Sequence, residues 1–174
     1  LGGSGWSTQG LNDLRTFYEN WNLPVAVAFR RQDLIDNRHT NYAGDFGLGI
    51  NPALADRADK ADLLLVIGAQ MSEIVTNGYD LFSLPCPHQT FIHVTAGLDE
   101  VARVYQPNLG INSGMNNFSS QVKNLRPQTS PPWGNWTRQA NNDHLNNIVL
   151  PKMVGDVDMG KIIEWLNQNL PDDA

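Results

Sequence analysis

The chain has 174 residues, of which 41% are hydrophobic, and a formal net charge of −6, which indicates a globular protein with one sizeable core. The acidic balance argues against nucleic acid or an anionic membrane surface as the main partner, and no apolar run reaches the roughly 18 residues that a bilayer span needs. The single cysteine, Cys86, excludes an internal disulfide framework and a zinc site built on cysteines, and it fits a reducing, cytoplasmic setting.

The chain opens on a glycine turn, Leu1-Gly2-Gly3-Ser4-Gly5-Trp6. Such a turn is typical of the exit from a strand, so we expect the chain to be a piece of a longer protein whose earlier residues are absent. The backbone N–H groups of the turn could cradle a phosphate at the next helix, or the turn could be a plain tight connection. It is not the dinucleotide fingerprint, because Thr8 stands where the third glycine is needed and the next strand ends in Arg30 and Arg31 rather than an acidic residue. Arg30 or Arg31 could instead contact a phosphate.

A strand–helix–strand unit follows this turn. Ser7 or Thr8 can cap a helix that runs to Trp21 with apolar residues at every third or fourth position. Residues 24–29 form a buried strand, and the crossover between parallel strands is almost always right-handed. The polar, glycine-bearing stretch 30–51 is predicted to be a long loop, and long ordered loops in compact domains tend to be functional.

Five consecutive aliphatic residues, Leu63 to Ile67, predict a strand covered on both faces, as in a parallel sheet with helices above and below. A short helix from Pro52 leads into this strand. Gly68 ends it where backbone can approach a ligand without an intervening Cβ, and ligands of open parallel sheets bind at the carboxyl ends of strands. Residues 90–95 form a further strand that reaches Gly97, and residues 108–112 a last, weaker one.

The histidines and acidic residues give no catalytic pattern. His93 lies in an apolar strand and is predicted to be a hydrogen-bonded core residue, and His39 is predicted to cap the backbone of its own loop. No two histidines have the spacing of metal ligands, and Glu73 and Asp80 do not form a recognisable acid–base pair. We therefore expect no catalytic and no metal-binding residue in the chain.

The character of the sequence changes after a helix predicted over residues 114–125. Residues 126–136 are rich in proline and indicate a linker. Two helices follow, one around residues 136–146 and one capped by Asp158, and their apolar faces need a partner. We therefore divide the chain into an α/β domain, residues 1–125, and a linker with a helical tail, residues 126–174.

Taken in order, these elements resemble the central domain of thiamine-diphosphate-dependent enzymes of the acetolactate synthase and pyruvate decarboxylase group. The resemblance covers residues 1–125 and rests on a succession of segments: residues 1–6, 23–27, 39–47, 58–70 and 91–101. It implies an α/β fold, a Rossmann-like three-layer sandwich with a mostly parallel six-stranded sheet whose first strand is truncated here. The tail would lead toward a diphosphate-binding domain outside this chain.

The resemblance also implies how the parent enzyme is built. Thiamine diphosphate and Mg²⁺ would be bound by domains outside this chain, so that this domain is largely structural and contacts flanking domains and neighbouring subunits of a homo-oligomer. In some members of the group the middle domain binds FAD or ADP. The corresponding cleft would be lined here by Gly2, Gly3, Ser4, Gly47, Gly68, Ala69, Gln70 and Thr95.

Three departures from the FAD-binding members argue against FAD. Gln70 stands where they have an arginine, and Gly49-Ile50 where they have His-Gly. Thr95 and Gly97 stand where they have aspartates. Losing a guanidinium and two carboxylates removes the charge-assisted hydrogen bonds that would hold a dinucleotide, so we expect an empty or differently occupied, vestigial nucleotide cleft.

Two other functions stay open. One is a stand-alone NAD-binding enzyme of the Rossmann type, either a dehydrogenase or a deacylase. The missing third glycine speaks against the dehydrogenase, and the missing four-cysteine zinc site speaks against the common deacylase. The other is a pure interaction module, which the apolar faces of the tail helices support.

Overall fold

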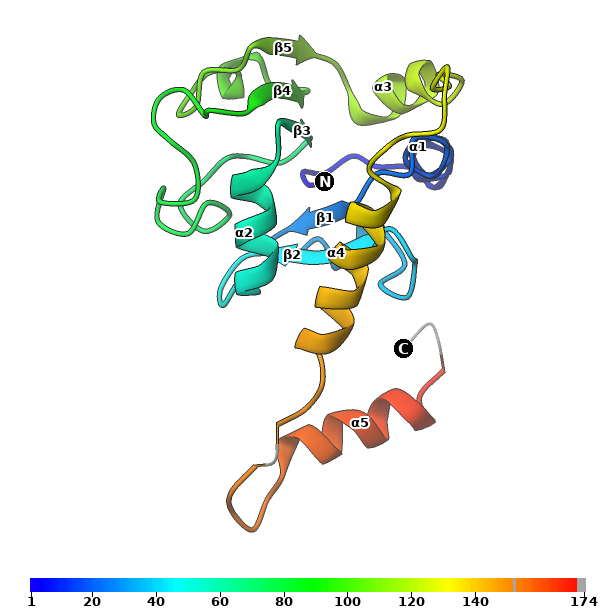
Figure 1. Ribbon diagram of the computed structural model, residues 1–174, viewed down its shortest axis with the longest axis vertical. Helices are drawn as coiled ribbons and strands as arrows, with labels where there is room; N and C mark the ends of the chain where they lie inside the picture. The colour runs from blue at the N-terminus through cyan, green and yellow to red at the C-terminus, as the bar shows by residue number, and fades with distance from the viewer. Residues whose placement is uncertain (152, 172–174) are drawn as a thin grey trace.

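The computed structural model describes residues 1–151 and 153–171. Within these residues, five strands form two sheets in which every pair of neighbours is parallel (Figure 1). The strands are β1 (Val25–Ala28) and β2 (Tyr42–Phe46) in one sheet, and β3 (Leu63–Ile67), β4 (Thr90–Thr95) and β5 (Leu109–Asn112) in the other.

The backbone of Leu1 and Gly2 joins the two sheets. The amino group of Leu1 donates to Ala26 O at 2.7 Å, Ala28 N donates to Leu1 O at 2.7 Å, and Gly2 N donates to Ile67 O at 2.9 Å. Counting Leu1, which lies between β1 and β3, the order across the molecule is β2, β1, Leu1, β3, β4, β5, which is that of the Rossmann fold. The predicted Rossmann-like architecture is confirmed, although the structure has five strands instead of six.

Helices cover both faces of this arrangement, giving three layers (Figure 1). Helices α1 (Thr8–Asn20) and α3 (Met115–Val122) pack against each other, and α2 (Pro52–Lys60) packs against α4 (Gly134–Asn147), which also lies on β2. Short 3-10 turns, η1 (Gln32–Leu34) and η2 (Leu98–Glu100), follow β1 and β4. Helix α5 (Met159–Asn169) lies apart from the α/β unit and has no buried residue.

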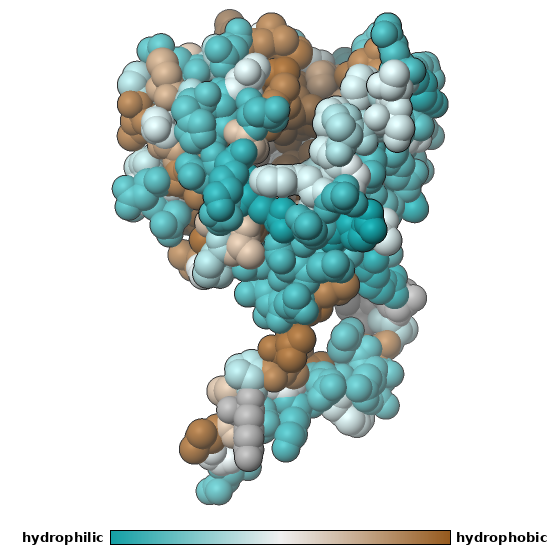
Figure 2. All heavy atoms as spheres, in the orientation of Figure 1, coloured by the Kyte–Doolittle hydropathy of each residue, from teal (hydrophilic) through white to brown (hydrophobic). Residues whose placement is uncertain are grey.

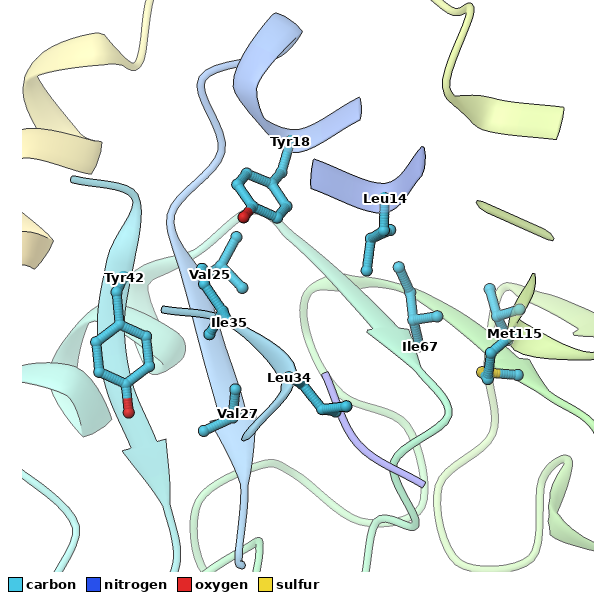
Figure 3. Packing of buried hydrophobic residues seen from close by; sticks show 10 residues of the cluster. Leu14, Tyr18, Val25, Val27, Leu34, Ile35, Tyr42, Ile67 and Met115 are labelled. Carbon is cyan, nitrogen blue, oxygen red and sulfur yellow. The ribbon is translucent and has the colours of Figure 1, made fainter. Parts of the chain in front are cut away.

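Alternation along the strands divides the core between the two faces. Val25 and Val27 of β1 point toward α1, where they meet Leu14, Tyr18 and Ile67 (Figure 3). Because successive residues of a strand point to opposite faces, Ala26 packs on the other face, against a cluster that contains Leu54 of α2 and Ala140 of α4. The α1 face is therefore filled by large side chains, and the α2–α4 face of β1 by small ones.

The helix ends follow local signals that the sequence contains. The Oγ of Ser7 accepts a hydrogen bond from Gly10 N at 3.0 Å, so Ser7 is the N-cap of α1. Asp158 caps α5 in the same way, through Lys161 N. Both predicted caps are confirmed.

One predicted loop contains a strand. Residues 42–46, placed in the loop 30–51, form β2 and pair with β1, so the loop prediction was wrong there. The misleading signal was Gly44, which has φ +114° and lies where a Cβ would be 3.6 Å from His144 Nδ1 and 3.4 Å from Leu54 Cδ2. At these distances a Cβ would make ordinary van der Waals contacts, so the glycine is favoured by its positive φ, which lies beside a register shift in the pairing of β1 with β2.

Both faces of residues 63–67 are covered as expected, since Leu65 packs with the α1 cluster and Leu64 and Val66 pack with a second cluster around Phe91, but the strand is more exposed than the sequence predicts. Only Ile67 of β3 is buried, and the exposed fraction of Leu63 is 48%. The reason is that the backbone on the β1 side of β3 reaches only as far as Leu1 and Gly2, which pair with its carboxyl end. The rest of β3 is an edge facing a gap.

Candidate functional site

A cleft of about 640 Å³ lies at the carboxyl ends of the strands, within the size range of small-molecule sites. Its walls come from the turn after Leu1, the end of β1, the segments that follow β3 and β4, and α3. The lining residues are Gly3, Ser4, Ala28, Phe29, Arg31, Gly68, Ala69, Gln70, Ser72, Ile74, Val75, Thr95, Ala96, Gly97, Asp99, Glu100 and Met115.

Most of the residues predicted for a nucleotide cleft lie together in it. Gly3, Ser4, Gly68, Ala69, Gln70 and Thr95 line the cleft, whereas Gly2 and Gly47 do not. A Cβ on Gly2 would lie 2.6 Å from Ala69 Cβ, and one on Gly47 would lie 2.9 Å from Phe29 Cδ2. Gly2 and Gly47 therefore allow close packing beside the cleft.

The floor of the cleft is formed where the backbone of Gly68 lies against the backbone of Gly2. Gly68 has φ +74°, and a Cβ on it would lie 2.5 Å from Gly2 O and 2.7 Å from Met115 Sδ. Beside it, the Nε2 of His93 donates to Ala69 O at 3.0 Å, and burial lowers the pKa of His93. The prediction of His93 as a hydrogen-bonded core residue is confirmed, and this neutral imidazole holds the floor in place.

The charges around the cleft are poorly suited to a pyrophosphate. Among the described residues that line it, Arg31 is the cationic one, and its guanidinium is bound by Asp33 at 2.9 Å. Asp99 and Glu100 supply two carboxylates, of which Glu100 is paired with Arg103 at 2.7 Å. Hydrogen bonding from the hydroxyl and amide groups of the lining is what the cleft offers instead.

Asn116 of α3 holds the glycine turn through hydrogen bonds, and the N-terminal end of α1 does not line the cleft. Asn116 accepts from Ser7 N through Oδ1 at 3.0 Å and donates from Nδ2 to Gly5 O at 2.9 Å. The Oγ of Ser7 accepts a hydrogen bond from Gly10 N. The cleft lining reaches Ser4 and stops before the helix. The sequence allowed either a phosphate-binding turn or a plain tight connection, and this geometry favours the plain connection.

His39 lies outside the cleft. Its Nδ1 accepts from Asn41 N at 3.1 Å and its Nε2 contacts Glu19 Oε1 at 2.9 Å. The prediction that it caps the backbone of its own loop is confirmed. Across residues 1–151 and 153–171, no three His, Cys, Asp or Glu side chains gather as they would around a metal ion, and no helix is both long and apolar enough to cross a bilayer.

Sequence reasoning missed several lining residues. Asp99 and Glu100 follow Gly97 just after β4, so the rule that ligands bind at the carboxyl ends of strands could have found them. Arg31, which the sequence offered with Arg30 as a phosphate contact, does line the cleft. Ile74, Val75 and Met115 had no such signal, because their position depends on how the segment after β3 and the start of α3 fold back over the sheet.

The chain is similar to known proteins over this whole α/β unit. A family model described as "Thiamine pyrophosphate enzyme, central domain" matches residues 1–122. A pyruvate decarboxylase of Aspergillus terreus (strain NIH 2624 / FGSC A1156) is 33% identical over 70 residues, which are 40% of this chain and 12% of that protein. The large subunit of acetolactate synthase isozyme 2 of Escherichia coli (strain K12) is 21% identical over 144 residues, which are 83% of this chain and 25% of that protein. The matched segment is thus a quarter or less of either relative.

Proposed function

The chain belongs to the family of thiamine pyrophosphate enzyme central domains, and from this premise we propose that it is the middle domain of a larger thiamine-diphosphate-dependent enzyme. The enzyme makes or breaks C–C bonds next to a carbonyl, as the names of the two relatives suggest. In this proposal the chain contributes structure, and the residues that bind thiamine diphosphate and Mg²⁺ lie in other domains.

The observation that carries the proposal is the match of the family over residues 1–122, which contains every strand of the described structure. The described residues do not fit thiamine diphosphate and its metal, since no carboxylate cluster is gathered among them. A hard, hexacoordinate cation such as Mg²⁺ takes oxygen ligands that are brought together at one point. This supports a division of labour between domains.

The cleft is proposed to be a vestigial nucleotide site that does not bind FAD. Gln70 lies in the lining, and the guanidinium of Arg31 is engaged by Asp33. With Asp99 and Glu100 in the same wall, a pyrophosphate would meet more negative than positive charge. Like charges at close range disfavour binding.

The surface of the tail is proposed to contact flanking domains or neighbouring subunits of a homo-oligomer. Figure 2 shows hydrophobic side chains on the lower part of the molecule. Exposed apolar patches of this kind mark interaction sites. The exposed residues are Ile148, Val149, Leu150, Met153, Val154, Val157, Met159, Ile162, Ile163, Trp165 and Leu170. The exposed, unpaired thiol of Cys86 fits a cytoplasmic enzyme.

Calorimetric titration of the chain separates this proposal from a stand-alone NAD-binding enzyme. We expect no binding of thiamine diphosphate with Mg²⁺, of FAD or of NAD below about 1 mM, a limit that corresponds to about 4 kcal/mol of binding free energy. Micromolar binding of NAD would favour the stand-alone enzyme. Micromolar binding of FAD would show that the cleft is a working cofactor site.

The coding region on either side of the chain provides a second test. A glutamate-bearing domain upstream and a Gly-Asp-Gly … Asn-Asn type of metal motif downstream would agree with the proposal. A reading frame without either would overturn it, whatever the titrations show.

A further inference from the structure

A second, smaller pocket lies beside the cleft, between the segment that follows β3 and the segment that follows β4. It has a volume of about 150 Å³, and Gln70, Ser72 and Glu100 line both the pocket and the cleft. Since a water molecule needs about 10 to 15 Å³ of such space, the pocket has room for a molecule of roughly ten non-hydrogen atoms. Thiamine diphosphate, NAD and FAD are far larger, so the pocket by itself accommodates none of them.

His93 lines the pocket and supplies a hydrogen-bond acceptor. Its Nε2 lies 3.0 Å from Ala69 O, and because a carbonyl oxygen can only accept, the Nε2 carries the proton. The Nδ1 therefore holds a lone pair, for which the structure shows no donor within residues 1–151 and 153–171. The ring is stacked on Phe91 with the ring centres 5.5 Å apart. A neutral, fixed acceptor of this kind suits a ligand with an N–H or O–H group.

An ion pair lines the pocket together with this imidazole. Glu100 Oε1 accepts from Arg103 Nη1 at 2.7 Å, and the side chains are 15% and 63% exposed. The carboxylate of Glu100 is close enough to His93 to act on its pKa, which it raises against the larger effect of burial. The pocket thus combines a carboxylate near a neutral acceptor with a guanidinium that is one hydrogen bond away from that carboxylate.

These groups complement the two charges of an α-amino acid. An ammonium group has only donors, which the carboxylate of Glu100 and the Nδ1 of His93 accept. A carboxylate matches the guanidinium of Arg103. Because both groups of an α-amino acid are attached to one carbon, they can lie beside the ion pair with alternating signs. A simple amine or a simple carboxylate would instead leave an unbalanced charge in a partly buried place.

The rest of the lining favours a polar ligand side chain. The hydroxyls of Ser72 and Tyr79 and the amide of Gln70 line the pocket, and among the described residues none of these three groups has a hydrogen-bonding partner. They offer donors and acceptors to a ligand hydroxyl. A purely aliphatic side chain would displace water from them and leave them unpaired.

Tyr105, in the same lining, adds a buried hydroxyl. Tyr105 is 2% exposed, and its Oη makes no hydrogen bond within the described part of the chain. The hydroxyl of Thr76 is close enough to act on the pKa of Tyr105, but it lies outside hydrogen-bonding geometry and donates its own proton to Ser72 O at 2.8 Å. Buried hydroxyls nearly always have a partner, so a ligand with a hydroxyl of its own supplies what this lining lacks.

We propose that the pocket binds a small α-amino acid with a hydroxyl side chain, of the serine and threonine class. Its ammonium group lies between Glu100 and His93, and its carboxylate lies against Arg103. The inference does not rest on the proposed function. If it fails, the middle-domain proposal still stands or falls on the titrations with thiamine diphosphate, FAD and NAD.

Calorimetric titration of the whole chain with L-threonine tests the proposal. L-valine is the matched control, because it has the same shape and carries a methyl group in place of the hydroxyl. We expect L-threonine to bind with a Kd below about 1 mM and L-valine to bind about five- to tenfold more weakly. A Kd for L-threonine above that limit, or equal affinities for the two amino acids, overturns the proposal.

Two derivatives of threonine test the charges without altering the protein. N-acetyl-L-threonine lacks the ammonium group, and L-threonine methyl ester lacks the carboxylate. Each should bind at least about tenfold more weakly than L-threonine, because each loses a charge-assisted contact. A derivative that binds as tightly as threonine itself would show that its missing charge is not recognised, and the proposed zwitterion site would be wrong.

Variants of the ion pair place the ligand. Glu100→Gln and Arg103→Gln each remove one charge and should weaken L-threonine at least about tenfold. Glu73→Gln is the control, because Glu73 is exposed and lines neither the pocket nor the cleft, so its Kd should not change. Urea denaturation checks that each variant is folded. Since Arg103 lines the pocket and not the cleft, a loss of affinity with Glu100→Gln alone would place the ligand in the cleft and overturn the proposal.

Discussion

A Cβ placed on Gly68 would lie 2.5 Å from the carbonyl oxygen of Gly2. These two glycines, far apart in the sequence, bring the turn that opens the chain against the turn that ends β3. Gly68 also has φ +74°, a conformation that costs an L-residue about 1 kcal/mol or more. The floor of the cleft thus depends on the absence of a side chain at residue 68.

Gly68→Ala should therefore lower the free energy of unfolding by about 2 to 4 kcal/mol, since overpacking adds to the backbone cost. Gly5→Ala is the matched control, because Gly5 has φ +80° but no atom within 4 Å of an added Cβ. It should lose about 1 kcal/mol only. Urea denaturation of both variants measures the difference, and equal losses would mean that the contact with Gly2 is unimportant.

The arrangement of the α/β unit could be predicted because its signals are local. The aliphatic run Leu63 to Ile67, the cap at Ser7 and the glycine at residue 68 each specify a strand, a helix start or a turn without reference to distant residues. Strand β2 was missed because its Gly44 adopts φ +114° beside a register shift that exists only in the pairing with β1. No short-range pattern contains that information.

The cleft could be predicted in part for the same reason. Gly68, Gln70 and Thr95 follow strands that are visible in the sequence, and the rule of carboxyl ends places them at one edge. Gly47 also follows a strand, β2, yet it packs on Phe29 outside the cleft. Sequence order alone does not separate a residue that lines a cleft from one that packs behind it.

Helix α4 is fastened to the α/β unit by Arg57. The Nε of Arg57 donates to Asp143 Oδ2 at 2.7 Å, and its guanidinium lies 5.0 Å from the centre of the Trp136 ring. The side chain of Arg57 is only 16% exposed, so this pair is screened less than a surface one. Arg57→Ala should lower the free energy of unfolding by about 1 to 3 kcal/mol.

Lys60→Ala, in the same helix, is the control for this change. Its partner is Asp56, and both side chains are more than half exposed, at 62% and 56%, so we expect a loss below about 0.5 kcal/mol. Trypsin should cut after Arg138 of α4 faster in the Arg57 variant than in the Lys60 variant. The same cleavage rate in both would contradict a role of Arg57 in holding α4.

The side chain of Asn116 links α3 to the opening turn through Ser7 N and Gly5 O. Asn116→Ala removes both hydrogen bonds and should cost about 1 to 3 kcal/mol of unfolding free energy. Asn117→Ala in the same helix is the control, because the side chain of Asn117 is exposed and its loss should fall within about 0.5 kcal/mol. If thermal or urea denaturation finds the two variants equally stable, Asn116 does not brace the turn.

The buried amino group of Leu1 should make stability depend on pH. Its pKa falls from 8.0 to about 5 in the folded chain because of burial. Between these values the unfolded chain holds the proton and the folded chain does not, so unfolding takes up a proton and stability rises with pH. The slope reaches at most about 1.4 kcal/mol per pH unit, and the contribution levels off above pH 8 and below pH 5.

Acetylation of Leu1 isolates this contribution from the titration of other groups. The acetyl amide keeps a donor for Ala26 O and cannot take up a proton, so the acetylated chain should gain most over the free chain near pH 5 and least near pH 8. His93 and His144, whose pKa values burial also lowers, produce a slope of the same sign in both forms and cancel in the comparison. Urea denaturation of the two forms at pH 5, 6, 7 and 8 measures the difference. Stability curves that run parallel across this range would show that the amino group reaches water in the folded state.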